Sequence, residues 1–199
     1  AMPGIVAEGR RVVNNIQQSA SLFLVKNIFS FLLSLFSVVF MMSYPLQPSQ
    51  ISLISMFTIG IPGFFLAFQP NKDVIKGHFL TNVVLKALPA GLTDVLAVAA
   101  MAVFGQTFGL GETDISTAGT MLLAIVGFMI LFKICEPFNW LRGCVWGGSV
   151  IGLLGCSIFL PKLFAITGMS TKCIMLFVVF SIATEPLFRY LTKLVSGVR

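Results

Sequence analysis

The chain has 199 residues, of which 57% are hydrophobic and only 10% are charged, with a mean hydropathy of +0.98. A soluble domain of this length carries far more charge on its surface, so the composition excludes an ordinary soluble protein. The net charge of +6 comes from scattered basic residues with no accompanying basic-aromatic motif, so we expect no nucleic acid among its partners.

Apolar runs long enough to cross about 30 Å of hydrocarbon, roughly 20 residues each, recur along the chain. Because continuous apolar runs suit helices, we predict an all-α polytopic membrane protein with six transmembrane helices, surrounded by membrane lipid. Their approximate ranges are 20–42, 51–68, 79–104, 117–135, 143–160 and 173–191. These ranges divide the chain into a cytoplasmic stalk segment, 1–19, and a six-helix transmembrane domain, 20–199.

Basic residues are concentrated on one side of the predicted membrane. That side carries Arg10, Arg11, Lys72, Lys76, Arg142, Arg189, Lys193 and Arg199. The other side carries Lys162 and Lys172 together with Glu112 and Asp114. Because cytoplasmic loops are enriched in Lys and Arg, we place the first side in the cytoplasm. Both termini are then expected to be cytoplasmic, which is consistent with an even number of spans.

The first span has no break on its cytoplasmic side. No Gly or Pro occurs from Arg10 to Ser43, and one helix over that stretch would be roughly 50 Å long. The hydrocarbon core takes up only about 30 Å, so the rest would project into the cytoplasm. Apolar residues at helical spacing, such as Val12 and Ile16, give the projection a stripe that needs a partner surface. We expect a rigid rod that packs against a cytoplasmic part. The alternative is an amphipathic helix on the membrane surface.

Lys26 and Asn27 interrupt the apolar part of this first span. A charge at the bilayer centre costs about 2.5 to 3.5 kcal/mol on insertion scales. Lys26 therefore either extends its ammonium to the headgroups or serves as an internal cation that occupies or tunes an ion site. Asn27 and Ser30 begin a polar stripe that either hydrogen-bonds a neighbouring helix or lines a pathway.

The second span contains Gly60, Pro62 and Gly63 near its middle. Pro62 has no N–H, so carbonyls near Thr58 and Ile59 lose their usual donors. Freed carbonyls at membrane depth are tolerated where they line a cavity, and transporters bind cations at such broken helices. The alternative is a simple proline kink that serves packing.

The third span contains Asp94, the one carboxylate deep in an apolar run, and Lys86 eight residues earlier. An acid at membrane depth is a candidate functional residue by default. Asp94 either contributes to a cation pathway or neutralises a lysine, Lys86 or Lys26. Lys86 would lie roughly 12 Å from Asp94 along an ideal helix, so a kink would have to bring the two together.

The remaining spans carry no recognisable chemistry. Glycines recur at about four-residue steps in the fifth span, which is typical of close helix packing. They are Gly143, Gly147, Gly148, Gly152 and Gly155. No nucleotide-binding loop, metal-ligand cluster or nucleophile–base set occurs. We therefore assign no catalytic residue and no cofactor to this chain.

Two stretches together resemble a known family. "EGRRVVNNIQQ" running into an apolar helix resembles the junction between the phosphorylation domain and the fifth membrane helix of P-type cation-transporting ATPases. "IGIPGFFLAFQPNKD" resembles their sixth helix and the cytoplasmic loop after it. Order, spacing and orientation agree over about the first 75 residues, and the other four spans agree in number only. The chain is thus similar to the C-terminal membrane part of such a pump, with a bacterial cell membrane as the expected location.

The resemblance implies further parts and partners. An upstream phosphorylation domain, a nucleotide domain and N-terminal membrane helices are expected. There ATP and magnesium would support formation of an aspartyl-phosphate. Whether the chain is itself an enzyme stays open, because those residues are not in it. The family's cation site lies in the middle of its fifth and sixth helices. The matching positions here are Asn27, Ser30, Thr58, Ile59 and Pro62.

The chain also departs from the family pattern. Calcium- and sodium-pumping members typically have an acid at the position matching Ser30 and an Asp at the position matching Ile59. This chain has neither, and it adds Lys26. A pocket poor in carboxylates holds a hard divalent ion weakly, unless Asp94 or other helices supply ligands. The transported cation therefore stays open, although the absence of a Cys-Pro-Cys motif argues against soft metals.

Two other functions remain open from the residues alone. The chain is alternatively a self-contained six-span permease or channel with Asp94 and Lys26 in its pathway. In a third interpretation it is a membrane scaffold whose polar residues only pack helices. The first of these predicts ion flux without ATP, whereas the second predicts that neither residue affects transport.

Overall fold

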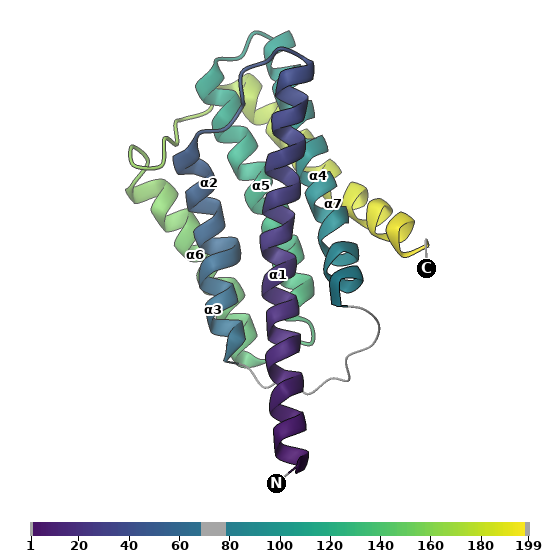
Figure 1. Cartoon of the computed structure of the whole chain (residues 1–199). Coiled ribbons are helices and arrows are strands. Elements are labelled where there is room, and N and C mark those ends of the chain that lie inside the picture. Colours follow the sequence, from purple (N-terminus) through teal and green to yellow (C-terminus); the bar gives the residue numbers. More distant parts are fainter. Residues whose placement is uncertain (1, 69–78, 198–199) are drawn as a thin grey trace.

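A computed structural model describes residues 2–68 and 79–197, and all regular structure in these ranges is helical (Figure 1). The elements are α1 (Met2–Val39), α2 (Pro48–Ser55), η1 (Met56–Gly60), α3 (Ile61–Ala67), α4 (Phe79–Thr107), α5 (Glu112–Cys135), α6 (Trp140–Phe159) and α7 (Thr171–Ser196). Six helical stretches in the described ranges are long and apolar enough to cross a membrane, with α2, η1 and α3 forming the second. The predicted all-α, six-span membrane fold is confirmed. Lys72, Lys76 and Arg199, which entered the orientation argument, lie outside the described residues.

The first helix is one uninterrupted rod. α1 runs for 38 residues and ends at Val39, four residues earlier than Ser43, the last residue of the predicted rod. Met41 has φ 52°, a left-handed conformation in which a helix of L-residues cannot continue. The N-terminal part of α1 projects beyond the other helices (Figure 1). Below, the end of the bundle from which α1 projects is called the projecting end.

The second span stays helical from Pro48 to Ala67, so Pro62 does not break it, but its hydrogen bonding changes at its centre. Between α2 and α3 the backbone forms a π-helical turn, η1, in which the Ile61 N–H donates to the Met56 carbonyl five residues earlier. Pro62 follows at the start of α3 and has no N–H for the Thr58 carbonyl four residues before it. Single π turns of this kind are frequent at functional sites.

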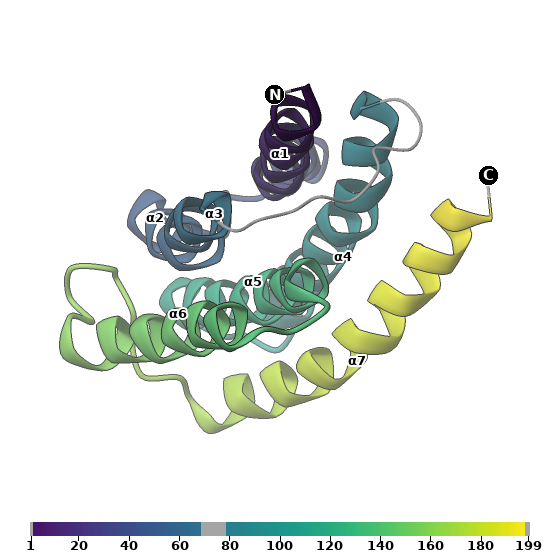
Figure 2. The same ribbon diagram turned by 90° about the horizontal axis from the view of Figure 1, so that it is seen from below.

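The centre of the bundle is made of α4 and α5, the two most buried spans. Seen along the bundle, α4 lies between α1 and α7 (Figure 2). Helices in lipid associate by close packing of small residues, and α4 contributes Ala87, Ala90 and Gly91 to its buried face. A Cβ on Gly91 would lie 2.7 Å from Cγ2 of Ile28. α1 therefore approaches α4 as closely as a glycine permits.

Hydrogen bonds join the second span to its neighbours at the end opposite the projecting end. Gln50 of α2 is wholly buried. Its Nε2 donates to Ser116 Oγ of α5 (3.2 Å) and to the Ala165 carbonyl in the α6–α7 connection (2.9 Å). Its Oε1 accepts from the Gln47 N–H (2.9 Å). The start of α2 is thereby fixed, and the π turn η1 lies between this anchored end and α3.

Candidate functional site

A cavity of about 40 Å³ lies among α1, the second span, α4 and α5. Its polar lining side chains are Lys26, Ser55, Thr58 and Asp94. The remaining lining residues are Leu22, Val25, Phe29, Ile51, Ile54, Ile59, Leu123, Gly127 and Ile130. The volume is sufficient for a water molecule or a small ion. In this cavity, α1, the second span and α4 bring polar side chains together, and α5 adds an apolar wall.

Asp94 is the acidic residue of the cavity. Its side chain is 4% exposed, and no described group hydrogen-bonds its Oδ1. Lys26 of α1 is half-buried and lines the same cavity. Among the described residues, ion pairs within 4.0 Å join Glu8 to Arg11 and Glu185 to Arg189, but not Lys26 to Asp94. A buried carboxyl oxygen without a hydrogen-bond donor is costly, so this atom can accept a ligand.

Hydroxyl oxygens supply the other acceptors. Thr58 Oγ1 donates to the Ile54 carbonyl (2.8 Å), and Ser55 Oγ donates to the Ile51 carbonyl (2.7 Å). Each hydroxyl uses its one hydrogen in that bond, so its oxygen lone pairs remain available. The cavity therefore offers carboxylate and hydroxyl oxygens, the ligands preferred by hard cations.

Two glycines, one on α5 and one on α6, pack against side chains of the π turn η1. A Cβ on Gly127 of α5 would lie 2.8 Å from Cγ2 of Thr58, and a Cβ on Gly152 of α6 would collide with the Phe57 ring. Within the described residues, nothing lies within 4 Å of a Cβ placed on Gly143, Gly147, Gly148 or Gly155. The close packing predicted for the α6 glycines thus occurs at Gly152, and it positions η1.

The structure brings together four of the seven predicted pathway residues. Lys26, Thr58, Ile59 and Asp94 all line the cavity. Lys86, considered above as an alternative partner of Asp94, is exposed.

The other three lie apart from the cavity. Asn27 is exposed on α1, Ser30 is half-buried, and Pro62 is buried at the start of α3. Ser30 contacts Tyr44 in the α1–α2 connection. Burial raises the pKa of Tyr44, and the side-chain hydrogen bond with Ser30 opposes part of that rise. Tyr44 is therefore a neutral neighbour of Ser30 at ordinary pH.

Sequence reasoning missed Ser55 and Gly127. Ser55 lies about one turn before Thr58, so helical spacing from that residue would have found it. Gly127 gave no signal, because a single glycine in an apolar helix does not indicate which residue it contacts. Within the described ranges, no group of three or more His, Cys, Asp or Glu side chains is arranged to hold a metal ion.

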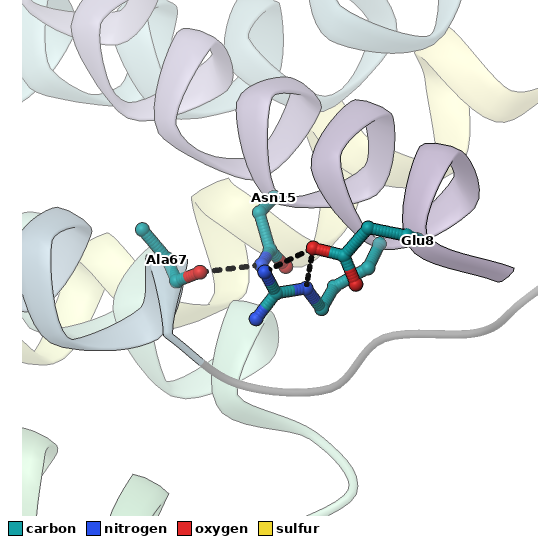
Figure 3. A network of polar contacts seen from close by, with 4 residues as sticks. Glu8, Asn15 and Ala67 are labelled. Carbon is teal, nitrogen blue, oxygen red and sulfur yellow. Dashed lines mark hydrogen bonds and ion pairs between the residues drawn. The ribbon is translucent and has the colours of Figure 1, made fainter. Parts of the chain in front are cut away.

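A hydrogen bond joins α1 to α3 near the projecting end. Asn15 is buried, and its Nδ2 donates to the Ala67 carbonyl at the end of α3 (2.8 Å). Figure 3 shows Asn15 reaching across to Ala67, with Glu8 and its ion pair to Arg11 nearer the N-terminus. The final carbonyls of a helix lack partners within that helix, so Asn15 satisfies one of them. The rod is thereby joined to the second span.

Comparison with known proteins identifies relatives along most of the chain, although no family model matches it. The chain is 36% identical over 178 residues to "Probable cation-transporting ATPase exp7" of Streptococcus pneumoniae, which covers 85% of this chain and 23% of that protein. It is 32% identical over 155 residues to "Calcium-transporting ATPase CtpE" of Mycolicibacterium smegmatis, which covers 71% of this chain and 20% of that protein. The chain thus spans less than a quarter of the length of either relative. Since these ATPases align with most of the chain, and the chain forms six membrane-spanning helices, it belongs to the P-type cation-transporting ATPases as part of their membrane region.

Proposed function

We propose that this chain is the C-terminal membrane part of a bacterial cation pump, and that the cavity beside η1 is part of its cation pathway. The observation that carries the proposal is Asp94, whose buried Oδ1 has no described hydrogen-bond partner and which lines a cavity beside a π turn. Names of the relatives that refer to cation and calcium transport support the same function.

Asp94 supplies the charge that attracts the cation, and Ser55 and Thr58 supply neutral oxygen ligands. Calcium takes about six to eight oxygens, so these side chains alone leave its shell incomplete. The remaining ligands come from backbone carbonyls near Thr58 and Ile59 and from the N-terminal membrane helices of the pump. Asn27, exposed on α1, belongs to the part of the pathway that those helices complete, together with Ser30.

Lys26 acts as an internal cation of the same cavity. Its ammonium balances the Asp94 carboxylate when no transported ion is bound, which lowers the cost of a buried charge. Removing the ammonium therefore strengthens cation binding and slows cation release.

Movement reaches the cavity through α1. An upstream phosphorylation domain, which uses ATP and magnesium, displaces the cytoplasmic stalk, 1–19. The uninterrupted helix carries that displacement to Lys26, and Asn15 transmits it to α3 through the Ala67 carbonyl. Pro62 provides no N–H to the Thr58 carbonyl, which favours the π turn at η1 and lets the Thr58 region rearrange. Both termini lie in the cytoplasm, as the positive-inside rule indicates.

The test compares the pump with Asp94→Asn, Lys26→Met and the control Lys86→Met, whose lysine is exposed on the same helix as Asp94. Purified full-length proteins are assayed for ATP hydrolysis and for uptake into proteoliposomes across a panel of mono- and divalent cations. We expect Asp94→Asn to lower apparent cation affinity at least tenfold, Lys26→Met to raise it, and Lys86→Met to leave it unchanged.

The same assays identify the competing interpretations. Unchanged transport in both cavity variants would mean that Asp94 and Lys26 only pack helices. Uptake without ATP by this chain alone would instead favour a self-contained permease or channel.

A further inference from the structure

A second, larger cavity opens between α5, α6 and α7. This groove has a volume of about 800 Å³ and adjoins the C-terminal end of α5. Its lining is Ile125, Phe128, Met129, Phe132, Lys133, Glu136, Trp146, Val150, Glu185, Phe188, Arg189, Thr192 and Lys193. None of these residues belongs to the cavity beside η1, so the groove is a separate feature.

One wall of the groove is aromatic and held in place. The Trp146 Nε1 donates to the Phe128 carbonyl (3.0 Å), which fixes the indole of α6 against α5. The Phe132 ring packs edge-on against Trp146, with ring centroids 5.8 Å apart. An apolar surface that is fixed in the free protein binds an acyl chain without paying for its own ordering.

Charged residues occupy the other part of the groove. Glu185 pairs with Arg189, which leaves Lys133, Lys193 and Glu136 outside the ion pairs of the described residues. Lys133 Nζ lies over the Phe188 ring, 4.1 Å from its centroid, where the aromatic wall meets the charged part. The five charged residues of the groove, three basic and two acidic, sum to one positive charge, which an anionic group of single charge would neutralise.

The location of the charged residues indicates which kind of ligand the groove binds. The groove lies between helices long enough to span a membrane, and Lys133 and Lys193 lie in the last turns of α5 and α7. The ends of such helices are at the depth of the lipid headgroups. Basic pockets between membrane helices recognise anionic headgroups. We propose that this groove binds an anionic glycerophospholipid. Its phosphodiester lies between Lys133 and Lys193, and an acyl chain lies along Phe132 and Trp146.

The test uses the delipidated full-length protein in detergent, titrated with phosphatidylglycerol or phosphatidylcholine of identical chains. Thermal unfolding and native mass spectrometry measure binding. Lys133→Gln with Lys193→Gln is compared with Lys162→Gln with Lys172→Gln, a pair of lysines at the opposite end of the bundle. We expect phosphatidylglycerol to raise the Tm of the wild type and the control by several degrees more than phosphatidylcholine does, and the groove variant to bind it at least tenfold more weakly.

Three outcomes would overturn the lipid site. They are equal Tm shifts with both lipids, an undiminished response in the groove variant, and complete competition by glycerol phosphate, which lacks acyl chains. The single substitutions Lys133→Gln and Lys193→Gln, each folded as judged by Tm without lipid, provide the same comparison if the double variant is unstable. Cation affinity is unaffected in every case, so failure here is distinct from failure of the proposed pathway.

Discussion

At the scale of single residues, the lining of the cavity depends on which lysine lies near Asp94 and on which glycine contacts Thr58. Asp94 attracts attention in the sequence because acids are rare at membrane depth, yet the sequence does not decide between Lys26 and Lys86 as its neighbour. The structure places Lys26 in the same cavity and leaves Lys86 exposed. Gly127, by contrast, has no distinguishing feature in the sequence, and its importance follows only from its contact with Thr58.

We predict that Gly127→Val destabilises the protein and impairs cation binding. The new Cβ would lie 2.8 Å from Thr58 Cγ2, and Thr58 cannot rotate away without losing its bond to the Ile54 carbonyl. Overpacking of this kind typically costs about 1 to 3 kcal/mol. Thermal unfolding and cation-dependent ATP hydrolysis measure the effect. Gly147→Val, at a position with open space, should leave both unchanged, and equal losses in the two variants would contradict this account.

At the scale of elements, the first two spans differ in regularity: α1 is a continuous α-helix, whereas the second span contains the π turn η1. α1 is unbroken over 38 residues, so it can transmit a displacement along its length. The second span contains a π turn at η1 and a proline after it, so its centre has fewer regular hydrogen bonds to lose when it rearranges. Both properties could be predicted from the positions of Gly and Pro. The π-helical form of the irregularity could not, because Pro62 only removes a donor and neighbouring side chains determine how the backbone responds.

We predict that Pro62→Ala stabilises the second span but impairs transport. Alanine restores an N–H that can donate to the Thr58 carbonyl four residues earlier, which favours a regular α-helix in place of the π turn. A continuous α-helix would then remove the wide turn that presents Thr58 to the cavity. Uptake should fall at least tenfold while Tm is unchanged or higher. Pro48→Ala, at the first turn of α2 where proline is harmless, is the control. Normal transport by Pro62→Ala would exclude a role for the π turn.

We further predict that Asn15→Ala weakens the connection between α1 and α3. The substitution removes the Nδ2 donor to the Ala67 carbonyl, a loss of about 1 kcal/mol for a typical hydrogen bond. Tm should fall by a few degrees, and ATP hydrolysis should become less dependent on cation. The control is Gln18→Ala, on the same part of α1 and half-buried. If hydrolysis keeps its full cation dependence in Asn15→Ala, coupling does not pass through this contact.

At the scale of the whole molecule, the orientation that we propose in the membrane rests on the charge distribution. The α5–α6 connection lies near the projecting end, and the α6–α7 connection lies at the opposite end, because successive spans alternate in direction. The positive-inside rule assigns the first of these ends to the cytoplasm.

Cysteine labelling tests this assignment. In a background without Cys144, the exposed native cysteine, Lys162→Cys should react with an impermeant maleimide on intact cells. Asn139→Cys in the α5–α6 connection should react only after permeabilisation. Both positions are exposed, so a reversed pattern would show the opposite orientation rather than a lack of access.

The sequence by itself determined the six apolar spans, the uninterrupted first helix and the position of the irregularity near Pro62, because helix length, hydropathy and the missing N–H are local properties. It also indicated Lys26 and Asp94 as charged residues at membrane depth, and Thr58 and Ile59 as residues whose carbonyls lie beside Pro62. Only the tertiary structure decided that these four line one cavity while Asn27, Ser30 and Pro62 lie outside it. That outcome depends on how closely Gly91, Gly127 and Gly152 let helices distant in sequence approach one another. Contacts of that kind leave no periodic pattern along a single helix, since each is set by the shape of the facing side chain.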